Sequence, residues 1–444
     1  MKIRALKIKK FKNLEDFEIH FSDADSVNLI IGKNGSGKSN LLKAITLIFS
    51  QIYRGIDFTF DFELKYECRG AKIEINAKAG NSEFTQVLIN GEEISYSQLR
   101  SSISSENKSL LPNNIVVYYS GMSQEMQEIT QPHARSFRNK LIKGQSSLDI
   151  RDIFYFEPLH FELILLTFFS KDYKDEFLEN FNIKEFINCK IKFTNDAKKA
   201  KGNVLNVINR IKTIENKRRE IIIDKSELIR IKEDIGGIFE DIFFKTFDGI
   251  LIGGYIDSIS IQFSLSDDSI INSSDLSDGE KQLISIQGLT SFLKEKETLF
   301  LFDEPDTYMH LVWQAKFISS ISDLLYKNNM QAIVTTHSPQ LLSNLKEGTI
   351  FLIENGNVDY STKFYGRDIK YITLKMGGEN RPKIIQNKLE RIFNQLASVN
   401  SIKKLIQIKN LYNEIVPLIE NSDADSDLIE IKTEIDYLEE DLVE

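Results

Sequence analysis

The 444-residue sequence predicts an α/β fold, with a mixed central sheet flanked by helices. Three short apolar runs support this expectation. One precedes a glycine-rich loop and a helical pattern (27–45), one ends in two carboxylates (298–304), and one ends in a histidine (331–337). Each run has the length and composition of a buried strand, and each ends in residues suited to bind phosphate or activate water.

Composition agrees with a globular protein that has a sizeable core, since 41% of the residues are hydrophobic and 27% are charged. The two cysteines, Cys68 and Cys189, have neither metal-binding nor disulfide spacing, which predicts a reducing compartment. The first residues, MKIRALKIKKFKNL, lack the apolar stretch of a signal peptide, and no apolar run is long enough to span a bilayer. We therefore expect a cytoplasmic protein without membrane contact.

Residues 27–45, VNLIIGKNGSGKSNLLKAI, form the first of these runs with its loop and helix. Gly32, Gly37, Lys38 and Ser39 fill the template G-x-x-x-x-G-K-[ST] of a phosphate-binding P-loop. Glycines let backbone N–H groups turn towards phosphates, Lys38 reaches the β- and γ-phosphates, and Ser39 offers a hydroxyl to Mg²⁺. A chance glycine loop is disfavoured by the strand and helix on either side. The predicted nucleotide-binding residues are Gly32, Asn34, Gly35, Ser36, Gly37, Lys38, Ser39 and Asn40.

The run TLFLFDEP, residues 298–305, supplies the acidic partners that a P-loop needs. Asp303 is predicted to hold Mg²⁺ through water, and Glu304 to polarise the attacking water. A simple helix cap is the alternative, but an apolar strand ending in Asp-Glu-Pro makes it the weaker one. The run QAIVTTHS ends in His337, which is predicted to hydrogen-bond the γ-phosphate, although a lone histidine there is more often structural.

In this order the motifs GKNGSGKS, LSDGEKQ, LFLFDEP, DTYMH and TTHS resemble the ABC-type ATPase family, in particular its SMC/RecF-like branch. The resemblance implies a P-loop NTPase of ABC-ATPase type that uses ATP and Mg²⁺. It also implies a head-to-head homodimer or larger even-numbered oligomer, in which LSDGEKQ of one subunit closes over the ATP of the other. Ser277 and Gly279 would then contact the γ-phosphate in trans, with the helix beginning near Glu280.

Two positions of that family pattern are less clear in this sequence. The segment LKIKKFKNLEDFEIHF resembles the start of the SMC/RecF-like branch, which implies that Lys12 lies near the phosphates. Asp278 replaces the second glycine of the common signature, as is usual in that branch. For the glutamine that contacts the metal, Gln124 is the nearest candidate after the apolar run 114–121, but Gln127 and Gln131 are equally available.

Residues 364–393, with YGRD after the histidine and RP further on, resemble the tail of bacterial stand-alone ABC ATPases. That group includes the PtuA subunits of Septu anti-phage systems and ATPases that accompany retrons, and the AriA ATPase of the PARIS system is an alternative. The resemblance implies an ATPase that regulates a nuclease or toxin partner encoded nearby. A DNA-clamping ATPase of repair or recombination is the second hypothesis.

Four regions are expected: an N-terminal ATPase lobe (1–150), a helical insertion (151–250), a C-terminal ATPase lobe (251–375) and a helical, acidic partner- or oligomer-docking region (376–444). Residues 190–232 hold thirteen Lys or Arg and five Asp or Glu, whereas residues 416–444 hold eleven acidic residues and one lysine. The basic stretch predicts DNA binding or, with more weight, a solvated face of two amphipathic helices or an oligomer contact. In the DNA-binding interpretation, the cations that would meet phosphates are Lys198, Lys199, Lys201, Arg210, Lys212, Lys217, Arg218 and Arg219.

The acidic tail carries an apolar seam at helical spacing, which we expect to dock a partner or another protomer. The seam residues are Leu428, Ile431, Ile435, Leu438 and Leu442. Asp423 and Asp425 form a D-x-D, which could hold a metal in a TOPRIM nuclease. Too few residues follow the ATPase motifs for that domain, so a linker and helix cap are the favoured interpretation and no intrinsic nuclease is expected.

Overall fold

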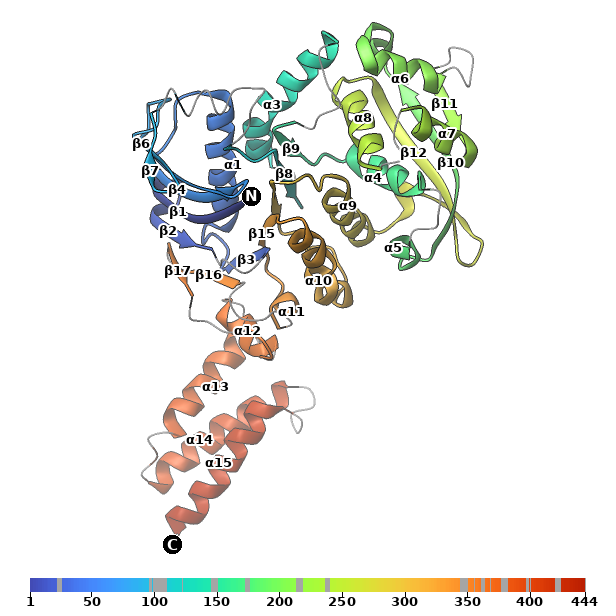
Figure 1. Cartoon of the computed structure of the whole chain (residues 1–444). Coiled ribbons are helices and arrows are strands. Elements are labelled where there is room, and N and C mark those ends of the chain that lie inside the picture. Colours follow the sequence, from blue (N-terminus) through green and yellow to red (C-terminus); the bar gives the residue numbers. More distant parts are fainter. Residues whose placement is uncertain are drawn as a thin grey trace. The chain divides into compact units, whose positions relative to one another are not determined.

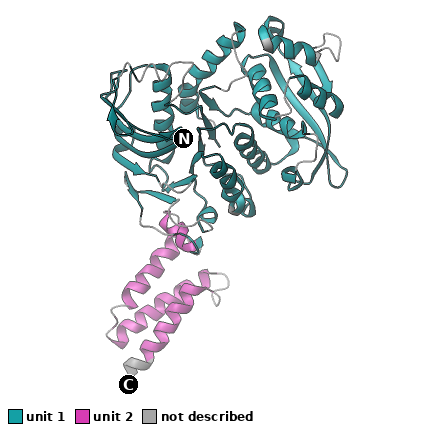
Figure 2. Cartoon of the chain, in the orientation of Figure 1, with its two compact units in different colours: residues 1–369 teal, residues 370–444 magenta. Residues whose placement is uncertain are grey.

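The structure is a computed structural model of the chain. The residues that it describes are 1–21, 26–95, 98, 110–121, 123–144, 151–171, 176–212, 219–235, 240–343, 350–354, 356–360, 364–367, 369–376, 382–396, 399, 401–419 and 425–443. The chain divides into two compact units, residues 1–369 and 370–444 (Figure 2). The expected boundary between the last two regions was six residues later, at 375/376.

The centre of the first unit is a seven-stranded sheet with the order β17-β16-β3-β15-β14-β8-β9. Its neighbouring strands are parallel, apart from the antiparallel pair β16 and β17. Each of the three apolar runs forms a strand here, so the carboxyl ends of β3, β14 and β15 meet at one edge. The strands are β3 (Val27–Gly32), β8 (Asn114–Tyr119), β9 (Ile153–Tyr155), β14 (Thr298–Asp303), β15 (Gln331–Thr335), β16 (Ile350–Glu354) and β17 (Asn357–Asp359).

A second, antiparallel sheet has the order β2-β1-β4-β5-β6-β7. Its strands are β1 (Lys2–Phe11), β2 (Leu14–His20), β4 (Phe62–Cys68), β5 (Ala71–Ala77), β6 (Gln86–Ile89) and β7 (Glu92–Glu93). Helix α1 (Lys38–Arg54) follows the P-loop and shares one continuous core with both sheets (Figure 1). Its buried Leu41, Leu42 and Ile45 belong to that core, which fixes the start of the helix beside the P-loop.

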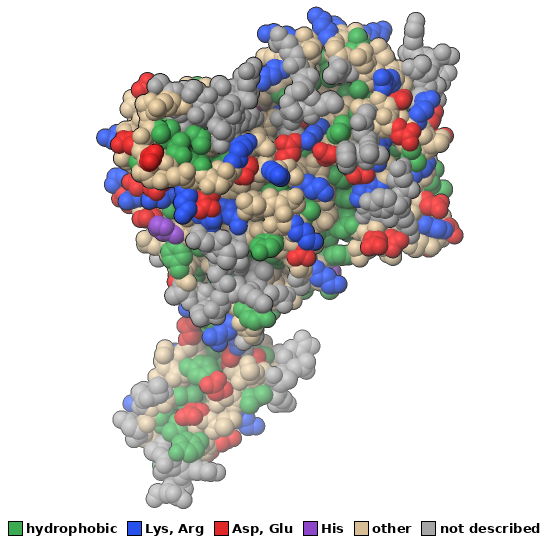
Figure 3. All heavy atoms as spheres, viewed as in Figure 1, with side chains coloured by type: hydrophobic (Ala, Val, Ile, Leu, Met, Phe, Trp, Pro, Cys, Tyr) green, Lys and Arg blue, Asp and Glu red, His purple; other side chains and the backbone are tan. Residues whose placement is uncertain are grey.

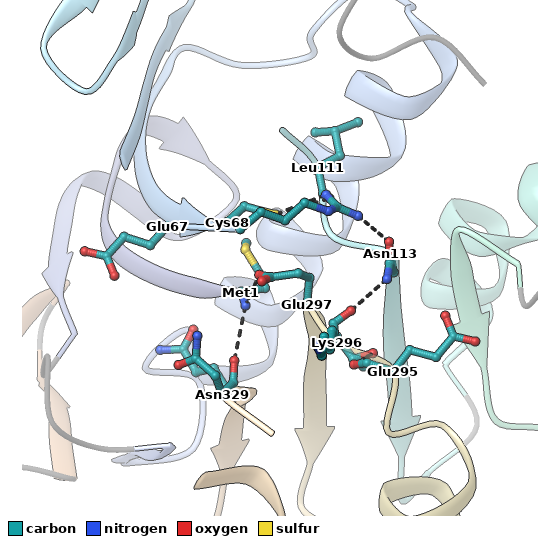
Figure 4. A network of polar contacts seen from close by, with 12 residues as sticks. Met1, Glu67, Cys68, Leu111, Asn113, Glu295, Lys296, Glu297 and Asn329 are labelled. Carbon is teal, nitrogen blue, oxygen red and sulfur yellow. Dashed lines mark hydrogen bonds and ion pairs between the residues drawn. The ribbon is translucent and has the colours of Figure 1, made fainter. Parts of the chain in front are cut away.

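A polar network joins the two sheets at the end opposite the P-loop (Figure 4). The Met1 amine pairs with Glu297 and donates to the Asn329 carbonyl oxygen over 3.3 Å. Asn113 Nδ2 donates to the Lys296 carbonyl oxygen over 2.8 Å. Burial raises the pKa of the neighbouring Cys68 thiol to about 12, so this cysteine is an inert part of the core.

The segment 151–250 is not purely helical, so that prediction was wrong. It contains β10 (Ile183–Phe193) and β11 (Glu220–Ile223), which join β12 (Ile256–Leu265) and β13 (Ile270–Asn272) in an antiparallel sheet of order β11-β10-β12-β13. The residues Glu220–Ile223, which lie in the stretch expected to form two amphipathic helices, pair with Cys189–Lys192 instead. Several helices accompany this sheet: α4 (Leu159–Phe169), α5 (Glu176–Glu179), α6 (Gly202–Lys212), α7 (Lys225–Asp234) and α8 (Glu240–Ile252).

Other helices of the first unit lie close to the functional motifs. They are α3 (Gln124–Ile142), α9 (Asp278–Phe292), α10 (Leu311–Lys327) and α11 (Pro339–Ser343), and α12 (Ile369–Lys375) follows at the junction. No helix within the described part of the chain is both long enough and apolar enough to cross a membrane.

The second unit contains α13 (Lys383–Leu396), α14 (Ile402–Ile415) and α15 (Ser426–Val443). Leu428, Ile431 and Ile435 of the predicted seam are buried against α13 and α14, and Leu438 packs beside them. The side chain of Leu442 lies outside the described residues. The expectation that this seam is open to a partner was therefore wrong, because two helices earlier in the same unit cover it.

The proposed D-x-D is only partly within the described residues, because Asp423 lies outside them. Asp425 Oδ1 accepts hydrogen bonds from the N–H groups of Asp427 (3.2 Å) and Leu428 (3.1 Å). The interpretation of Asp425 as a helix cap is thereby confirmed.

Candidate functional site

The P-loop is a tight backbone cradle between β3 and α1. Gly32 has φ +151° and Gly37 has φ +111°, and both values lie in the region that side chains disfavour. A Cβ atom on Gly32 would lie 2.4 Å from the Ile353 carbonyl oxygen, and one on Gly37 would lie 2.6 Å from Leu14 Cδ2. Gly37 caps α1 without a side-chain hydrogen bond, so the first N–H groups of the helix face the loop.

Lys38 lies inside this cradle and is 5% exposed. Its Nζ donates to the carbonyl oxygens of Gly32 (2.9 Å) and Lys33 (3.3 Å). Burial lowers the pKa of Lys38, while the nearby Glu304 and Asp303 carboxylates counteract part of that effect. Its ammonium group is therefore held by loop carbonyls, which a phosphate can replace as a stronger, charged partner.

The turn between β1 and β2 supports the loop. Asn13 Nδ2 donates to the Gly35 carbonyl oxygen over 2.6 Å, and Asn40 Nδ2 donates to Asn13 Oδ1 over 2.7 Å. The structure thus brings Asn40 to the loop. Lys12 belongs to the same turn but pairs with the Glu125 carboxylate of α3, which also accepts from Lys43 Nζ over 2.9 Å.

The two carboxylates at the end of β14, Asp303 as its last residue and Glu304 directly after it, have different environments. Asp303 is 2% exposed and accepts a hydrogen bond of 2.6 Å from Thr335 Oγ1 on β15. Burial raises the pKa of Asp303, although Thr335, Tyr119 and Ser39 oppose this by hydrogen bonding. The proximity of Ser39 and Asp303 meets the first requirement of a shared metal site.

The backbone of Glu304 is strained and is fixed by hydrogen bonds to Thr335. It has φ +48°, and its N–H donates to both the carbonyl oxygen and the Oγ1 of Thr335, each over 3.1 Å. His337 Nε2 lies 3.1 Å from Glu304 Oε1, and this hydrogen bond holds the pKa of Glu304 below its ordinary value. A half-exposed, ionised carboxylate at this position can accept a proton from water.

The sequence LSDGEKQ begins helix α9. Ser277 is its N-cap: Ser277 Oγ accepts from the Glu280 N–H (3.3 Å), and Glu280 Oε2 accepts from the Ser277 N–H (2.8 Å). Gly279 lies against the turn after β14, where an added Cβ would be 2.4 Å from the Tyr308 carbonyl oxygen. The glycine is thus required by a contact within the chain.

Two residues near the site were missed by sequence reasoning. Gln282 is buried and joins α9 to the turn after β14, accepting from the Tyr308 N–H over 3.1 Å. Tyr119, the last residue of β8, interacts through its hydroxyl with Ser39 and Asp303. The only available signal was the pair of tyrosines ending the run 114–119.

The glutamine candidates lie on α3. Gln124 is exposed, and its Nε2 donates to Glu128 Oε1 over 3.1 Å. Gln127 and Gln131 line a pocket together with Arg151 and Tyr155. The structure thus places Gln124 on the exposed first turn of α3.

The residues present fit ATP with Mg²⁺. Gly32 and Gly37 leave no space for a Cβ atom, and Ser36 Oγ is buried without a hydrogen-bond partner among the described residues. Lys38 supplies a cation, and Ser39 and Asp303 supply the hydroxyl and carboxylate oxygens that Mg²⁺ prefers. This donor set matches a phosphorylated nucleotide and its metal.

Comparison with known proteins agrees with this chemistry. Residues 1–342 match the family model described as "AAA ATPase domain". A segment of 71 residues is 35% identical to Protein ea59 of Escherichia phage lambda, covering 16% of this chain. The match spans only 13% of the length of that phage protein.

Solved SMC head domains also show similarity to this chain. The SMC head domain from Thermotoga maritima is 16% identical with a TM-score of 0.35, covering 81% of this chain and 97% of that chain. An Smc head domain from Pyrococcus furiosus, solved with the C-terminal domain of ScpA, is 16% identical with a TM-score of 0.35, covering 81% and 95%. Both TM-scores are low.

Proposed function

Because the chain belongs to the AAA ATPase domain family, we propose that it binds ATP with Mg²⁺ and hydrolyses it at the edge of the central sheet. One observation carries this proposal. The P-loop with Lys38 and the carboxylates Asp303 and Glu304 come from positions more than 260 residues apart, and parallel pairing of β3, β15 and β14 brings them to one edge.

Each side chain has a distinct role in this proposal. The P-loop N–H groups and Lys38 bind the phosphates and neutralise the charge that develops as the γ-phosphoryl group is transferred. Ser39 and Asp303 hold Mg²⁺, which supplies further charge neutralisation when it is bound. Glu304 orients a water molecule in line with the γ-phosphate and accepts its proton, while His337 fixes the carboxylate.

The proposal extends to a dimer in which two copies share each nucleotide. The start of α9 is exposed at Ser277 and Asp278, and its capping box uses the N–H groups of Ser277 and Glu280 but not those of Asp278 and Gly279, which are suited to an anion. In the SMC/RecF-like resemblance this helix start meets the γ-phosphate of the other subunit. We therefore expect ATP to join two copies and hydrolysis to separate them.

Glu304→Gln tests the hydrolysis and the dimer together. The amide cannot accept a proton, so ATP turnover should fall at least about 100-fold, whereas ATP binding persists and the dimer accumulates. Steady-state phosphate release and light scattering after size exclusion, with and without ATP, measure the two effects. Glu295→Gln is a control, because Glu295 pairs with Lys245 away from the P-loop.

In a control experiment, Lys38→Ala should abolish nucleotide binding and therefore dimerisation. Wild-type turnover by Glu304→Gln would contradict the role proposed for this carboxylate. Dimer formation by Lys38→Ala in ATP would contradict the proposal that ATP joins the subunits.

The finer proposal is that nucleotide state regulates a nuclease or toxin partner in anti-phage defence. It is supported by the resemblance of residues 364–393 to defence ATPases. The alternative of DNA clamping has less support, since several cations of the insertion are paired within the chain: Lys190 with Glu220, Lys192 with Asp257, and Lys199 with Asp196. Acidic and basic side chains are also interspersed on the visible face (Figure 3).

Of the remaining cations expected to bind DNA, Lys217, Arg218 and the Lys212 side chain lie outside the described residues. Native mass spectrometry of the protein expressed with its neighbouring genes distinguishes the two proposals. An even-numbered assembly carrying a nuclease-like polypeptide supports regulation of an effector. A bare dimer with bound DNA, released by moderate salt, supports the clamp instead.

A further inference from the structure

Tyr119 ends strand β8 directly beside the first carboxylate of the site. In the register of the parallel pair β8 and β14, Tyr119 is opposite Asp303. The next backbone group, the Ser120 N–H, donates to the Asp303 carbonyl oxygen over 3.1 Å. Residues opposite one another in a sheet project to the same face, so Tyr119 and Asp303 are side-by-side neighbours.

Helix α1 approaches Tyr119 from that face of the sheet. Ser39 and Lys43 are one helical turn apart and therefore lie on the same side of α1. Lys43 Nζ lies 5.9 Å from the centroid of the Tyr119 ring, and the ring packs against the core that α1 shares with both sheets. The Tyr119 hydroxyl is close enough to the side chains of Ser39 and Asp303 for both to influence its pKa, which burial raises. One side chain thus lies beside both of the expected metal ligands.

We infer that Tyr119 is a positioning residue of the metal site, whose hydroxyl holds Ser39 and Asp303 in the relative orientation that Mg²⁺ requires. This inference rests on the proposed ATP function and assigns a residue that the motifs do not identify. The segment after β8 was expected to contribute a glutamine, with Gln124 the nearest candidate and Gln127 and Gln131 equally available. The Gln124 side chain is exposed and bonded to Glu128. Mg²⁺ demands near-ideal octahedral geometry, so small errors in ligand orientation weaken its binding.

The ring of Tyr119 is itself held in place. Glu125 accepts from Lys43 Nζ over 2.9 Å and also pairs with Lys12, so Lys43 is fixed while it contacts the ring. Replacement by phenylalanine keeps the ring, its packing and the Lys43 contact, and removes only the hydroxyl. Tyr119→Phe is therefore a specific test of the hydroxyl group.

The experiment measures binding of a fluorescent ATP analogue to full-length protein, first in EDTA and then in a Mg²⁺ titration. For Tyr119→Phe we expect unchanged affinity in EDTA and a roughly three- to ten-fold higher Mg²⁺ concentration at half-maximal effect. Electron paramagnetic resonance of Mn²⁺ added with nucleotide should show the same weakening without relying on turnover. A purely structural role for Tyr119 would alter both nucleotide affinities equally.

Tyr66→Phe is the matched control. It removes a tyrosine hydroxyl that is buried and donates to the Leu110 carbonyl oxygen over 2.8 Å, and it should leave Mg²⁺ dependence unchanged. An unaltered or lower Mg²⁺ requirement in Tyr119→Phe overturns the inference. Wild-type protein that binds no nucleotide overturns the proposed function and, with it, the inference, so the two failures are distinguishable.

Discussion

Two buried aspartates in the first unit show how the insertion differs from the edge of the central sheet that carries the P-loop. Asp248 on α8 is 3% exposed, and Asp303 at the end of β14 is 2% exposed. Burial acts to raise the pKa of both carboxyl groups. For Asp248 this effect is outweighed by the positive charge of Arg151 and the hydrogen bond with His160, so the net pKa of Asp248 lies below the ordinary value. Asp303 interacts with hydroxyl groups, and its pKa stays above the ordinary value.

The partners explain the difference. Asp248 Oδ1 lies 3.0 Å from both Arg151 Nη2 and His160 Nε2, and His160 Nδ1 accepts from the Glu157 N–H over 2.7 Å. Within this cluster the positive charge of Arg151 balances the negative charge of Asp248, so we assign the cluster a role in stabilising the fold. The Asp303 carboxylate is oriented by Thr335 without comparable charge compensation, an arrangement that lowers stability and favours a bound cation.

Replacing Asp303 by asparagine should give the largest effect. We expect Asp303→Asn to lower ATP turnover at least about 100-fold, because a neutral amide is a poor partner for Mg²⁺. Its free energy of unfolding should stay equal or rise by about 1 kcal/mol, because a charge is no longer buried. Phosphate release and urea denaturation at pH 7.5 measure both. A large decrease in the free energy of unfolding of Asp303→Asn would contradict the proposed difference between the two aspartates.

The same substitution at Asp248 should have the opposite profile. Asp248→Asn leaves the Arg151 charge buried without a counter-charge, so the free energy of unfolding should fall by about 3 to 5 kcal/mol. Nucleotide affinity of the folded fraction should be unchanged. The exposed Asp241→Asn on the same helix is the control and should cost under about 1 kcal/mol. Equal stabilities of the two variants would refute a structural role for the cluster.

Asp306 offers a smaller, pH-dependent test. Burial raises its pKa from 3.8 to about 6, and Thr336 Oγ1 donates to its Oδ2 over 2.7 Å. Since the folded-state pKa is the higher one, its contribution to stability is complete below about pH 4 and is lost as the pH rises through 6. The free energy of unfolding of Asp306→Asn, relative to that of the wild type, should therefore be about 1 to 3 kcal/mol higher at pH 7.5 than at pH 4. Urea denaturation at the two pH values measures this difference. If the free energies of unfolding of the wild type and of Asp306→Asn changed equally with pH, the prediction would be wrong.

The sequence was informative wherever function depends on local patterns. The P-loop, the strand ending in Asp303 and Glu304, and Ser277 at the start of α9 each have neighbours along the chain that identify them. Tyr119 has no such signal, because its partners Ser39 and Asp303 are 80 and 184 residues away. Only the parallel register of β8 and β14 brings them together.

The same limit applies to the insertion and the acidic tail. Glu220–Ile223 is too short for periodicity to identify, and it becomes a strand because β10 offers a pairing edge. The seam of α15 was recognised correctly as apolar, but which surface covers it depends on α13 and α14. Amphipathic patterns define which face is buried and do not identify the surface that buries it.

The strand order of the central sheet has a consequence for synthesis of the protein. The P-loop strand β3 is made early, yet both of its neighbours, β15 and β16, belong to residues 331–354. Until the ribosome has translated those residues, β3 has no partner in its sheet and Gly32 lacks the Ile353 carbonyl oxygen against which it packs. A nascent chain of 300 residues therefore contains the whole P-loop sequence without the neighbouring strands of β3, and we expect it not to bind nucleotide.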